Sequence, residues 1–306
     1  MKYFIITVDT EGDNLWKYKK GQEVKTENTQ YIPRFQNLCE KYEFKPVWLT
    51  NYEMACDQRY VDYIKPKMEA GLCEVGIHVH AWNNPPLYNL DAKYSGNPYL
   101  IEYPEEVMKS KFEVTYNLIK EKFGIKAKSH RAGRWAMDNR YFSILKDFKI
   151  DVDCSFTPGI SWHIAPGETC MGSDYSDVTH YTSNINGVLE VPMTIRKMRR
   201  VHHGSVKHKL KVLLQGENIW LRPATSSLND MIALCDMVDK EENSDYLELM
   251  LHSSELMPNG SPYFPDEESI NLLYNDLDCL FKYIRKLGYA GITLENYCIN
   301  CRKNKQ

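Results

Sequence analysis

Residues 74–82 read EVGIHVHAW, a mostly apolar run that carries two histidines, His78 and His80. Gly71 precedes the run and the sequence NNPP follows it at 83–86, so the run predicts a buried strand that ends in a loop. Side chains two residues apart on a strand point to the same face of the sheet. We therefore expect both imidazoles to project into one space, which is the arrangement that a metal ion requires.

A second apolar run near the start of the chain supplies acids with the same spacing. Residues 5–8 read IITV and predict a strand, which is followed by Asp9 and, two positions later, by Glu11. These two carboxylates can also share one face. Two acids and two histidines at the ends of two early strands predict a mononuclear metal site.

Strands and helices alternate along the chain, which predicts an α/β fold with mostly parallel pairing and right-handed crossovers. A chain of 306 residues can form one large α/β domain, and we expect a single domain over 1–306 with an irregular insertion at about 157–225. The patterns predict helices at 30–42, 61–69, 103–123, 139–147, 228–240 and 266–287. They predict strands at 2–8, 46–49, 74–80, 127–130, 152–156, 188–192, 246–251 and 289–293.

Composition limits the classes of partner. The formal net charge of -3 gives no reason to expect nucleic-acid binding. The segment 196–211 is locally basic and could meet phosphate or an anionic membrane surface, although a solvated, partly mobile loop is the favoured interpretation. No run of 18 apolar residues is present, so we expect no transmembrane segment, and peripheral membrane contact stays open.

The cysteines and the N-terminus predict a cytoplasmic protein. The nine cysteines are odd in number, scattered and mostly within apolar segments, as is typical of reduced core thiols. The first strand begins almost at Met1, which leaves no room for a signal peptide. The pair Cys298 and Cys301 lacks the second half of a zinc ribbon and carries no functional prediction.

Polar residues follow several of the predicted strands, where an α/β barrel places its catalytic groups. Each of these residues alone has an ordinary explanation: a hydrogen-bonded histidine, a turn at Asp9 to Gly12, or a helix cap. Five such coincidences favour one common site. The set is Asp9 and Glu11, His78 and His80, His130 with Arg131 and Arg134, Asp151 with Asp153, and His252.

This pattern resembles the NodB-homology polysaccharide deacetylases, carbohydrate esterase family 4. The family's motifs have counterparts, in the family's order, in TVDTEG at 7–12, His78-Val79-His80, Arg131, DCS at 153–155 and LMLH at 249–252. The segments 74–86, 131–135 and 252–258 look especially like the branch found among bacterial lipopolysaccharide and capsule biosynthesis proteins. The resemblance implies a distorted (β/α) barrel of about seven parallel strands with a long inserted loop region.

The resemblance also implies metal-assisted removal of an N-acetyl group from a sugar that is linked to a nucleotide, a lipid or a polymer. A divalent ion, most plausibly Zn²⁺, would bind Glu11, His78 and His80, with Asp9 as the alternative to Glu11. In the first arrangement Asp9 would be the general base and His252 the general acid.

Other residues would support these groups. Arg131 would orient Asp9, and Asp153 would bias the His252 imidazole. Trp82, Arg134, Trp135 and Trp162 would contact the sugar; ordinary core packing is an equal alternative for Trp135 and a weaker one for Trp82. Two other classes stay open: another metal-dependent C–N hydrolase such as a deformylase, and a catalytically inactive sugar-binding protein.

Overall fold

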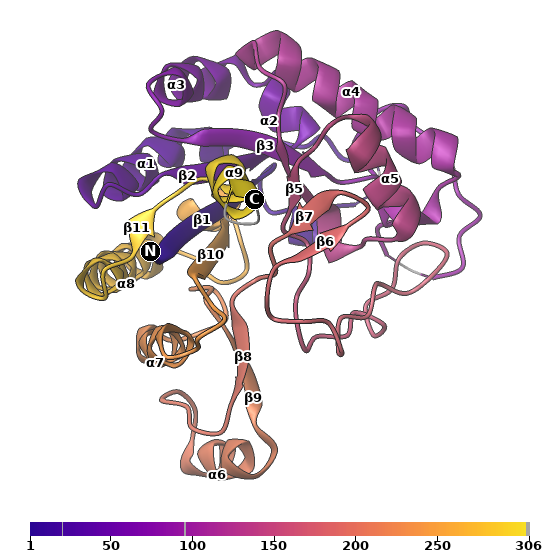
Figure 1. Ribbon diagram of the computed structural model, residues 1–306. Coiled ribbons are helices and arrows are strands. Elements are labelled where there is room, and N and C mark those ends of the chain that lie inside the picture. Colours follow the sequence, from indigo (N-terminus) through magenta and orange to yellow (C-terminus); the bar gives the residue numbers. More distant parts are fainter. Residues whose placement is uncertain (20, 95, 304–306) are drawn as a thin grey trace.

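The computed structural model describes residues 1–19, 21–94 and 96–303. Its centre is a curled sheet in the order β10-β1-β2-β3-β4-β5-β7-β6 (Figure 1). In addition, β11 pairs with the amino-terminal end of β1. Every described pair in this sheet is parallel except β6 with β7. The strands are β1 (Tyr3–Thr10), β2 (Pro46–Thr50), β3 (Glu74–Val79), β4 (Ser129–Ala132), β5 (Val152–Asp153), β6 (Ser183–Ile185), β7 (Val188–Glu190), β10 (Tyr246–His252) and β11 (Ala290–Gly291).

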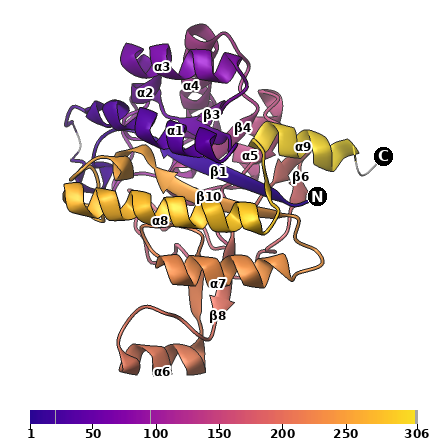
Figure 2. The ribbon, with the colours of Figure 1, turned by 90° about the vertical axis from the view of Figure 1, so that its left-hand side faces the viewer.

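Helices follow most of the strands and cover the convex side of the sheet, as Figures 1 and 2 show. This confirms the predicted α/β architecture, a distorted barrel with a mostly parallel sheet. Among the described residues no helix combines the length and the hydropathy that are needed to cross a bilayer. The helices are α1 (Ile32–Lys41), α2 (Tyr52–Cys56), α3 (Gln58–Glu69), α4 (Glu105–Phe123), α5 (Asn139–Asp147), α6 (Val206–Gln215), α7 (Leu228–Asp239), α8 (Glu267–Lys286) and α9 (Leu294–Lys303).

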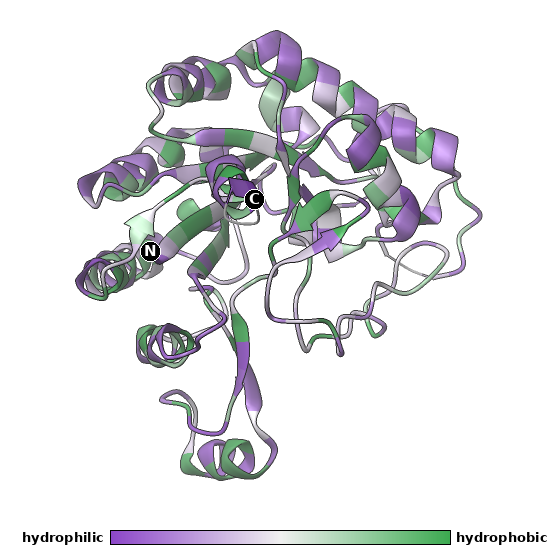
Figure 3. Cartoon of the chain, in the orientation of Figure 1, coloured by the Kyte–Doolittle hydropathy of each residue, from purple (hydrophilic) through white to green (hydrophobic). Residues whose placement is uncertain are grey.

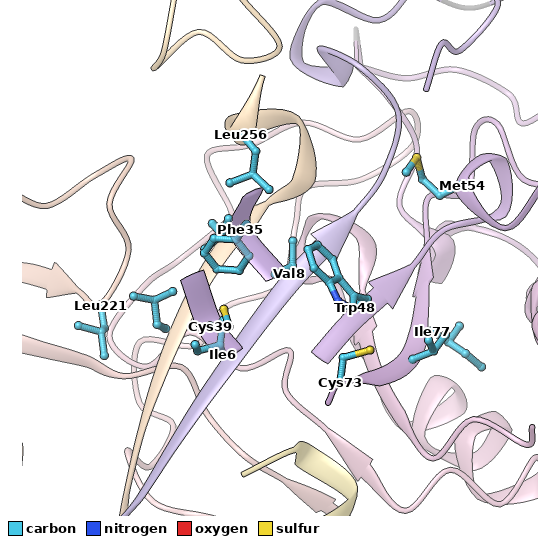
Figure 4. Packing of buried hydrophobic residues seen from close by; sticks show 14 of the residues in the cluster. Ile6, Val8, Phe35, Cys39, Trp48, Met54, Cys73, Ile77, Leu221 and Leu256 are labelled. Carbon is cyan, nitrogen blue, oxygen red and sulfur yellow. The ribbon is translucent and has the colours of Figure 1, made fainter. Parts of the chain in front are cut away.

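The alternation of side chains along each strand separates the core from the site. In β1, Ile6 and Val8 point toward the helices and pack with Phe35 of α1 and Trp48 of β2 (Figure 4). The intervening residues point to the concave face. Figure 3 shows apolar and polar residues alternating along the helices. The outer layer therefore holds the hydrophobic core, and the concave face is free for other chemistry.

The concave face changes character along the strands. Toward the amino ends, Ile5, Val47 and Val152 belong to an apolar cluster that Leu294 and Tyr297 of α9 cover. At the carboxyl ends the same face carries acids, histidines and a buried arginine. Because α9 fills one end of the curled sheet, the polar groups gather at the other end, where the predicted strand ends meet.

The segment predicted as an irregular insertion contains regular structure. Besides β6 and β7 it forms β8 (Ile195–Met198) and β9 (Glu217–Trp220), an antiparallel pair, with α6 between them. The prediction of a solvated loop over 196–211 is therefore wrong. Ser205 caps α6 by accepting a hydrogen bond from the His208 N–H, which is a start signal that the lysine-rich sequence obscured. Both views place α6 far from the sheet, at the tip of an arm (Figures 1 and 2).

Gly76 in β3 tests the close packing of the concave face. A Cβ atom at Gly76 would lie 2.3 Å from Ser129 Oγ and 3.0 Å from the Ser129 carbonyl oxygen on the neighbouring strand. We predict that Gly76→Ala lowers the free energy of unfolding by about 1–3 kcal/mol because it overpacks this contact. Urea denaturation of Gly76→Ala, Ser129→Ala and the double variant Gly76→Ala/Ser129→Ala measures the energetic coupling between positions 76 and 129. The double variant should be more stable than the sum of the single effects predicts, and strict additivity would contradict the contact.

Candidate active site

Three side chains converge at the carboxyl ends of β1 and β3. His80 Nε2 lies 2.6 Å from Glu11 Oε2 and 3.0 Å from His78 Nε2, and His78 Nε2 lies 3.6 Å from the same Glu11 oxygen. All three residues are buried. The predicted sharing of one face by His78 and His80, and their approach to Glu11, are thus confirmed.

The surroundings prepare these atoms for a cation. His78 Nδ1 lies 2.9 Å from the Arg131 carbonyl oxygen, which can only accept, so Nδ1 carries a hydrogen and Nε2 is the atom that faces Glu11. Burial lowers the pKa of His80 by more than Glu11 raises it, which favours the neutral ring. Burial raises the pKa of Glu11, but His80 and its other imidazole neighbours bring it well below its ordinary value.

A carboxylate and two imidazole nitrogens are a set of ligands that suits a divalent metal such as zinc. The backbone acceptor behind His78 is the kind of outer partner that orients metal-bound histidines. Glu11, His78 and His80 can therefore hold a metal ion.

Asp9 lies beside this cluster and across from His252. Its Oδ2 atom is 4.0 Å from His78 Nε2 and 3.8 Å from His252 Nε2. The other oxygen, Oδ1, accepts a hydrogen bond of 2.7 Å from Arg131 Nη1. Burial raises the pKa of Asp9, but the charge of Arg131, aided by the two imidazoles, outweighs burial and holds this pKa below its ordinary value. Asp9 is therefore an ionised carboxylate with one oxygen turned toward the site.

Arg131 is fully buried and satisfied on every side. Besides Asp9, it donates to Glu248 Oε1 at 2.6 Å, to Thr7 Oγ1 at 2.7 Å, to the Cys154 carbonyl oxygen at 3.0 Å and to Met193 Sδ at 3.4 Å. Burial raises the pKa of Glu248 to about 7, even though Arg131 opposes that rise. Near neutral pH Glu248 is therefore only partly ionised, and the main electrostatic interaction of Arg131 is with Asp9.

His252 is held by a pair of charged residues that sequence reasoning missed. Its Nδ1 atom lies 3.1 Å from Glu255 Oε1, and its backbone N–H donates to Glu255 Oε2 at 3.0 Å. Arg222 Nη2 donates to Glu255 Oε1 at 2.9 Å. Burial raises the pKa of Glu255, but Arg222 and His252 together lower it to about 2. An ionised Glu255 thus accepts the Nδ1–H and leaves His252 Nε2 facing Asp9.

The predicted role of Asp153 as the partner of His252 is wrong. Asp153 Oδ1 lies 2.6 Å from His130 Nδ1, and His130 Nε2 lies 2.7 Å from the Tyr141 hydroxyl of α5. The register explains this: His130 pairs with Asp153 across β4 and β5, and both point toward the helices, whereas Arg131 points to the concave face. One position along β5 decides the face, so Asp153 belongs to a buried structural network.

A cavity of about 390 Å³ opens above the acids and histidines. Trp82 lies against His80, with ring centres 4.2 Å apart, and Trp16 lies against His252 at 4.9 Å. The predicted contact residues Trp82, Arg134, Trp135 and Trp162 all line this cavity. The cavity wall also includes residues that carried no prediction, among them Trp16, Tyr99, Arg222 and Tyr263.

Arg134 and Trp135 form an unusual turn beside this cavity. Both have positive φ, 53° and 64°, a conformation that side chains rarely adopt outside constrained sites. Arg134 donates to the carbonyl oxygens of Asn97 and Pro166, and its guanidinium lies 4.2 Å from the Tyr99 ring centre. The turn thus presents Trp135 to the cavity, while Arg134 ties three loops together.

Some of the missed residues left a signal in the sequence. Glu255 stands three residues after His252, the spacing of a capping box, and its carboxylate does accept the His252 N–H. Glu248 interrupts the apolar strand β10 at an inward position. Trp16 reaches the cavity from a 3₁₀ turn at Leu15–Lys17 and Arg222 from a loop, and nothing in their local sequence indicates this.

No model of a known protein family matches the sequence, and no curated protein sequence matches it. Solved structures do. A protein of Parabacteroides distasonis described as a glycoside hydrolase/deacetylase superimposes with a TM-score of 0.62 at 11% identity, over 99% of this chain and 72% of that chain. One of Mycobacterium smegmatis described as a polysaccharide deacetylase gives 0.53 at 12% identity, over 99% and 92%. The chain has the fold of these two proteins.

A third structure shows how widely this fold is used. The 4-alpha-glucanotransferase of Thermococcus litoralis superimposes with a TM-score of 0.54 at 12% identity, over 97% of this chain but only 40% of that chain. At such identities the likeness establishes the fold alone. The chemistry of this chain has to be argued from its own side chains.

The cluster of Glu11, His78 and His80 predicts bound metal. We expect His78→Ala/His80→Ala to retain one equivalent less of divalent metal than the wild type, because two of the three ligands are lost. Elemental analysis of purified protein after dialysis measures this. The control is His163→Ala/His202→Ala, which removes two exposed histidines outside the cluster. An unchanged metal content in the His78/His80 variant would refute the assignment.

Proposed function

We propose that this chain is a divalent-metal-dependent hydrolase that removes the N-acetyl group from a sugar. One observation carries the proposal: Asp9 lies between the metal-binding cluster and His252, within 4.0 Å of His78 Nε2 and 3.8 Å of His252 Nε2. A base, an acid and a cation site thus meet at one end of a cavity whose other walls are aromatic.

The reaction adds water across the amide bond. The water oxygen forms a bond to the acetyl carbon, the bond from that carbon to the sugar nitrogen breaks, and acetate and a free amine leave. A metal bound by Glu11, His78 and His80 would polarise the carbonyl group and make water more acidic. Zinc suits these ligands best.

Asp9 is suited to take the proton from water. Its lowered pKa keeps it ionised at neutral pH, and Arg131 holds one carboxylate oxygen so that the other, Oδ2, faces the site. An ionised carboxylate at a fixed position can act as a general base at once, without a change of rotamer.

His252 is suited to give a proton to the departing amine. Glu255 fixes Nδ1, so Nε2 is the atom that faces the site from the side opposite His78. The nitrogen of a sugar amide bound between these residues would lie next to Nε2. Trp16 packs against the imidazole and shields it from solvent.

The cavity fits a sugar. Its volume of about 390 Å³ is within the usual range for small-molecule sites, and several indole rings offer flat apolar faces. We extend the proposal to an N-acetylated sugar of a bacterial surface polysaccharide, lipopolysaccharide or capsule. The sequences at 74–86 and 252–258 resemble the branch of the deacetylases found among lipopolysaccharide and capsule biosynthesis proteins. The expected cytoplasmic location stays a prediction.

The same side chains speak against glycoside cleavage, although a glucanotransferase shares the fold. Glycosidases use two carboxylates that flank the bond. In this site Glu11 faces two imidazoles and Asp9 faces Arg131, so neither carboxylate has the setting of a protonated acid. The acid position is taken by His252, which suits an amine leaving group.

Substitutions of Asp9 and His252 test this assignment. We predict that Asp9→Asn and His252→Gln each lower the rate of acetate release by about 10²–10⁴-fold, because each removes one proton-transfer step. Both variants should keep the metal, since neither residue belongs to the cluster of Glu11, His78 and His80. Released acetate is assayed with N-acetylated nucleotide sugars and lipid-linked sugars as substrates.

His163→Gln is the matched control, because His163 is exposed and does not line the cavity. Acetate release at the wild-type rate by His252→Gln would remove His252 from the mechanism. Loss of metal in Asp9→Asn would make Asp9 a ligand and Glu11 the base. If the wild-type protein binds metal and sugar but releases no acetate, the chain is a sugar-binding protein and not a hydrolase.

A further inference from the structure

A second group of metal-binding side chains lies on the arm, away from the cavity. His203 precedes α6, His208 lies in its first turn, and Glu217 begins β9. His208 Nε2 lies 3.0 Å from Glu217 Oε2, and His203 Nε2 lies 3.5 Å from Glu217 Oε1. The two imidazole ring centres are 5.1 Å apart. Three potential ligand atoms from three segments thus face one another.

A buried acid behind His203 fixes the direction of its ring. Asp230 of α7 is fully buried, and its Oδ2 lies 2.7 Å from His203 Nδ1. The Nδ1–H therefore donates to Asp230, and in the neutral ring the lone pair of Nε2 points at the Glu217 carboxylate. Two acceptors then face each other at 3.5 Å. A cation between them would satisfy both, and a carboxylate behind a metal-bound histidine is a common outer partner.

The backbone is also shaped around His208. Gly204 has a φ of 79°, and a Cβ atom there would lie 2.4 Å from the His208 ring. A residue with a side chain would push this ring away from Glu217. The local sequence His203-Gly204 thus combines one ligand with the space that the second ligand requires.

We propose that His203, His208 and Glu217 bind a second divalent metal ion, of the zinc class, that fastens the arm to the body of the protein. Two imidazoles and one carboxylate suit zinc, with one position left for water. Because Asp230 belongs to α7, the ion would connect α6, β9 and α7. This proposal is independent of the function proposed for the cavity.

The test uses a variant that lacks the first site, His78→Ala/His80→Ala, titrated with Zn²⁺ by calorimetry. We expect one equivalent to bind and to raise the melting temperature. Adding His203→Ala/His208→Ala should abolish both effects, and adding Asp230→Asn should weaken binding about 10–100-fold. Adding His202→Ala is the matched control, because His202 is the exposed neighbour of His203 and should change neither effect.

Two results would overturn the second site: absence of zinc binding in His78→Ala/His80→Ala, or zinc binding that survives the loss of His203 and His208. Circular dichroism checks that each variant is folded. Glu217→Gln gives a further measure, since the amide keeps the shape of the side chain but loses the charge. Binding as tight as in its parent would likewise overturn the assignment of Glu217 as a ligand.

An independent observation concerns the outer face of α6. Val206, Leu210, Leu213 and Leu214 follow the i, i+4, i+7, i+8 pattern of one helix face, and each side chain is 48–77% exposed. Val212, by contrast, is buried against the arm. Figure 3 shows α6 with both apolar and polar segments at the tip, remote from the sheet. Four large apolar residues exposed together mark a surface that binds something.

The charge around this face identifies the occupant. Residues 195–220 contain one acid, Glu217, and seven basic residues, in a chain whose net charge is -3. Arg196 is paired with Glu241. The other six are exposed: Lys197, Arg199, Arg200, Lys207, Lys209 and Lys211. An apolar helix face bordered by lysine and arginine is typical of helices that lie in the surface of an anionic membrane.

We infer that α6 docks the protein on an anionic lipid surface, with Leu210 and Leu214 inserted between the lipids. We predict flotation of the wild-type protein with phosphatidylcholine vesicles that contain phosphatidylglycerol, reduced by salt and absent with pure phosphatidylcholine. Leu210→Glu/Leu214→Glu should lower the bound fraction at least tenfold. Leu272→Glu is the matched control, because Leu272 of α8 is 59% exposed and lies outside the arm.

Three results would overturn the membrane assignment. They are absence of flotation with anionic vesicles, equal flotation with neutral vesicles, and flotation that survives Leu210→Glu/Leu214→Glu. A wild-type dimer that Leu210→Glu/Leu214→Glu converts to a monomer would also overturn it, because a second copy would then cover the face.

Discussion

The buried charge of Arg131 is the constraint on which the site depends. A guanidinium without access to water has to be paired and hydrogen-bonded, and here its partners come from β1, β10 and Cys154, the residue after β5. The same residue acts twice. Its side chain fixes Asp9, and its carbonyl oxygen accepts the hydrogen of His78 Nδ1 and so turns the other nitrogen toward Glu11. The base and one metal ligand are therefore positioned by one residue of β4.

A buried ion pair of this kind makes the fold sensitive to the loss of either partner. Removal of one partner of a buried ion pair typically costs about 3–5 kcal/mol, because it leaves an unpaired charge in the interior. Arg131 has two carboxylate partners, Asp9 and Glu248, and the pKa of about 7 for Glu248 shows that the second is only partly ionised. The apolar cluster beneath, where α9 covers Ile5 and Val47, keeps water away from the amino-terminal side of this network.

Strand parity explains which parts of the site could be predicted from the sequence. In each of the pairs His78/His80 and Asp9/Glu11, the first residue lies on a buried strand and the second lies one position past its end, so their common face follows from the sequence alone. Asp153 follows the same logic and fails, because β5 is only two residues long and its register, set by pairing with His130, turns the carboxylate outward. The general order of strands and helices was also predictable, because each element carries a regular spacing of apolar residues. The arm was not, because lysines interleave with the apolar positions of α6.

The remaining residues of the site are brought in by tertiary structure. Arg222 follows β9 and reaches Glu255 only because β9 and β10 are close in space, and Trp16 reaches His252 from a 3₁₀ turn after β1. Such contacts have no local periodicity that a single sequence could reveal. The chain matches no family model, yet part of its site could be recognised from the sequence. The metal-binding cluster and Asp9 depend on strand geometry, which tolerates wide changes in sequence. The walls of the cavity come largely from the segments between strands, and residues there such as Trp16, Tyr99 and Tyr263 are the ones that would adapt the site to a particular sugar.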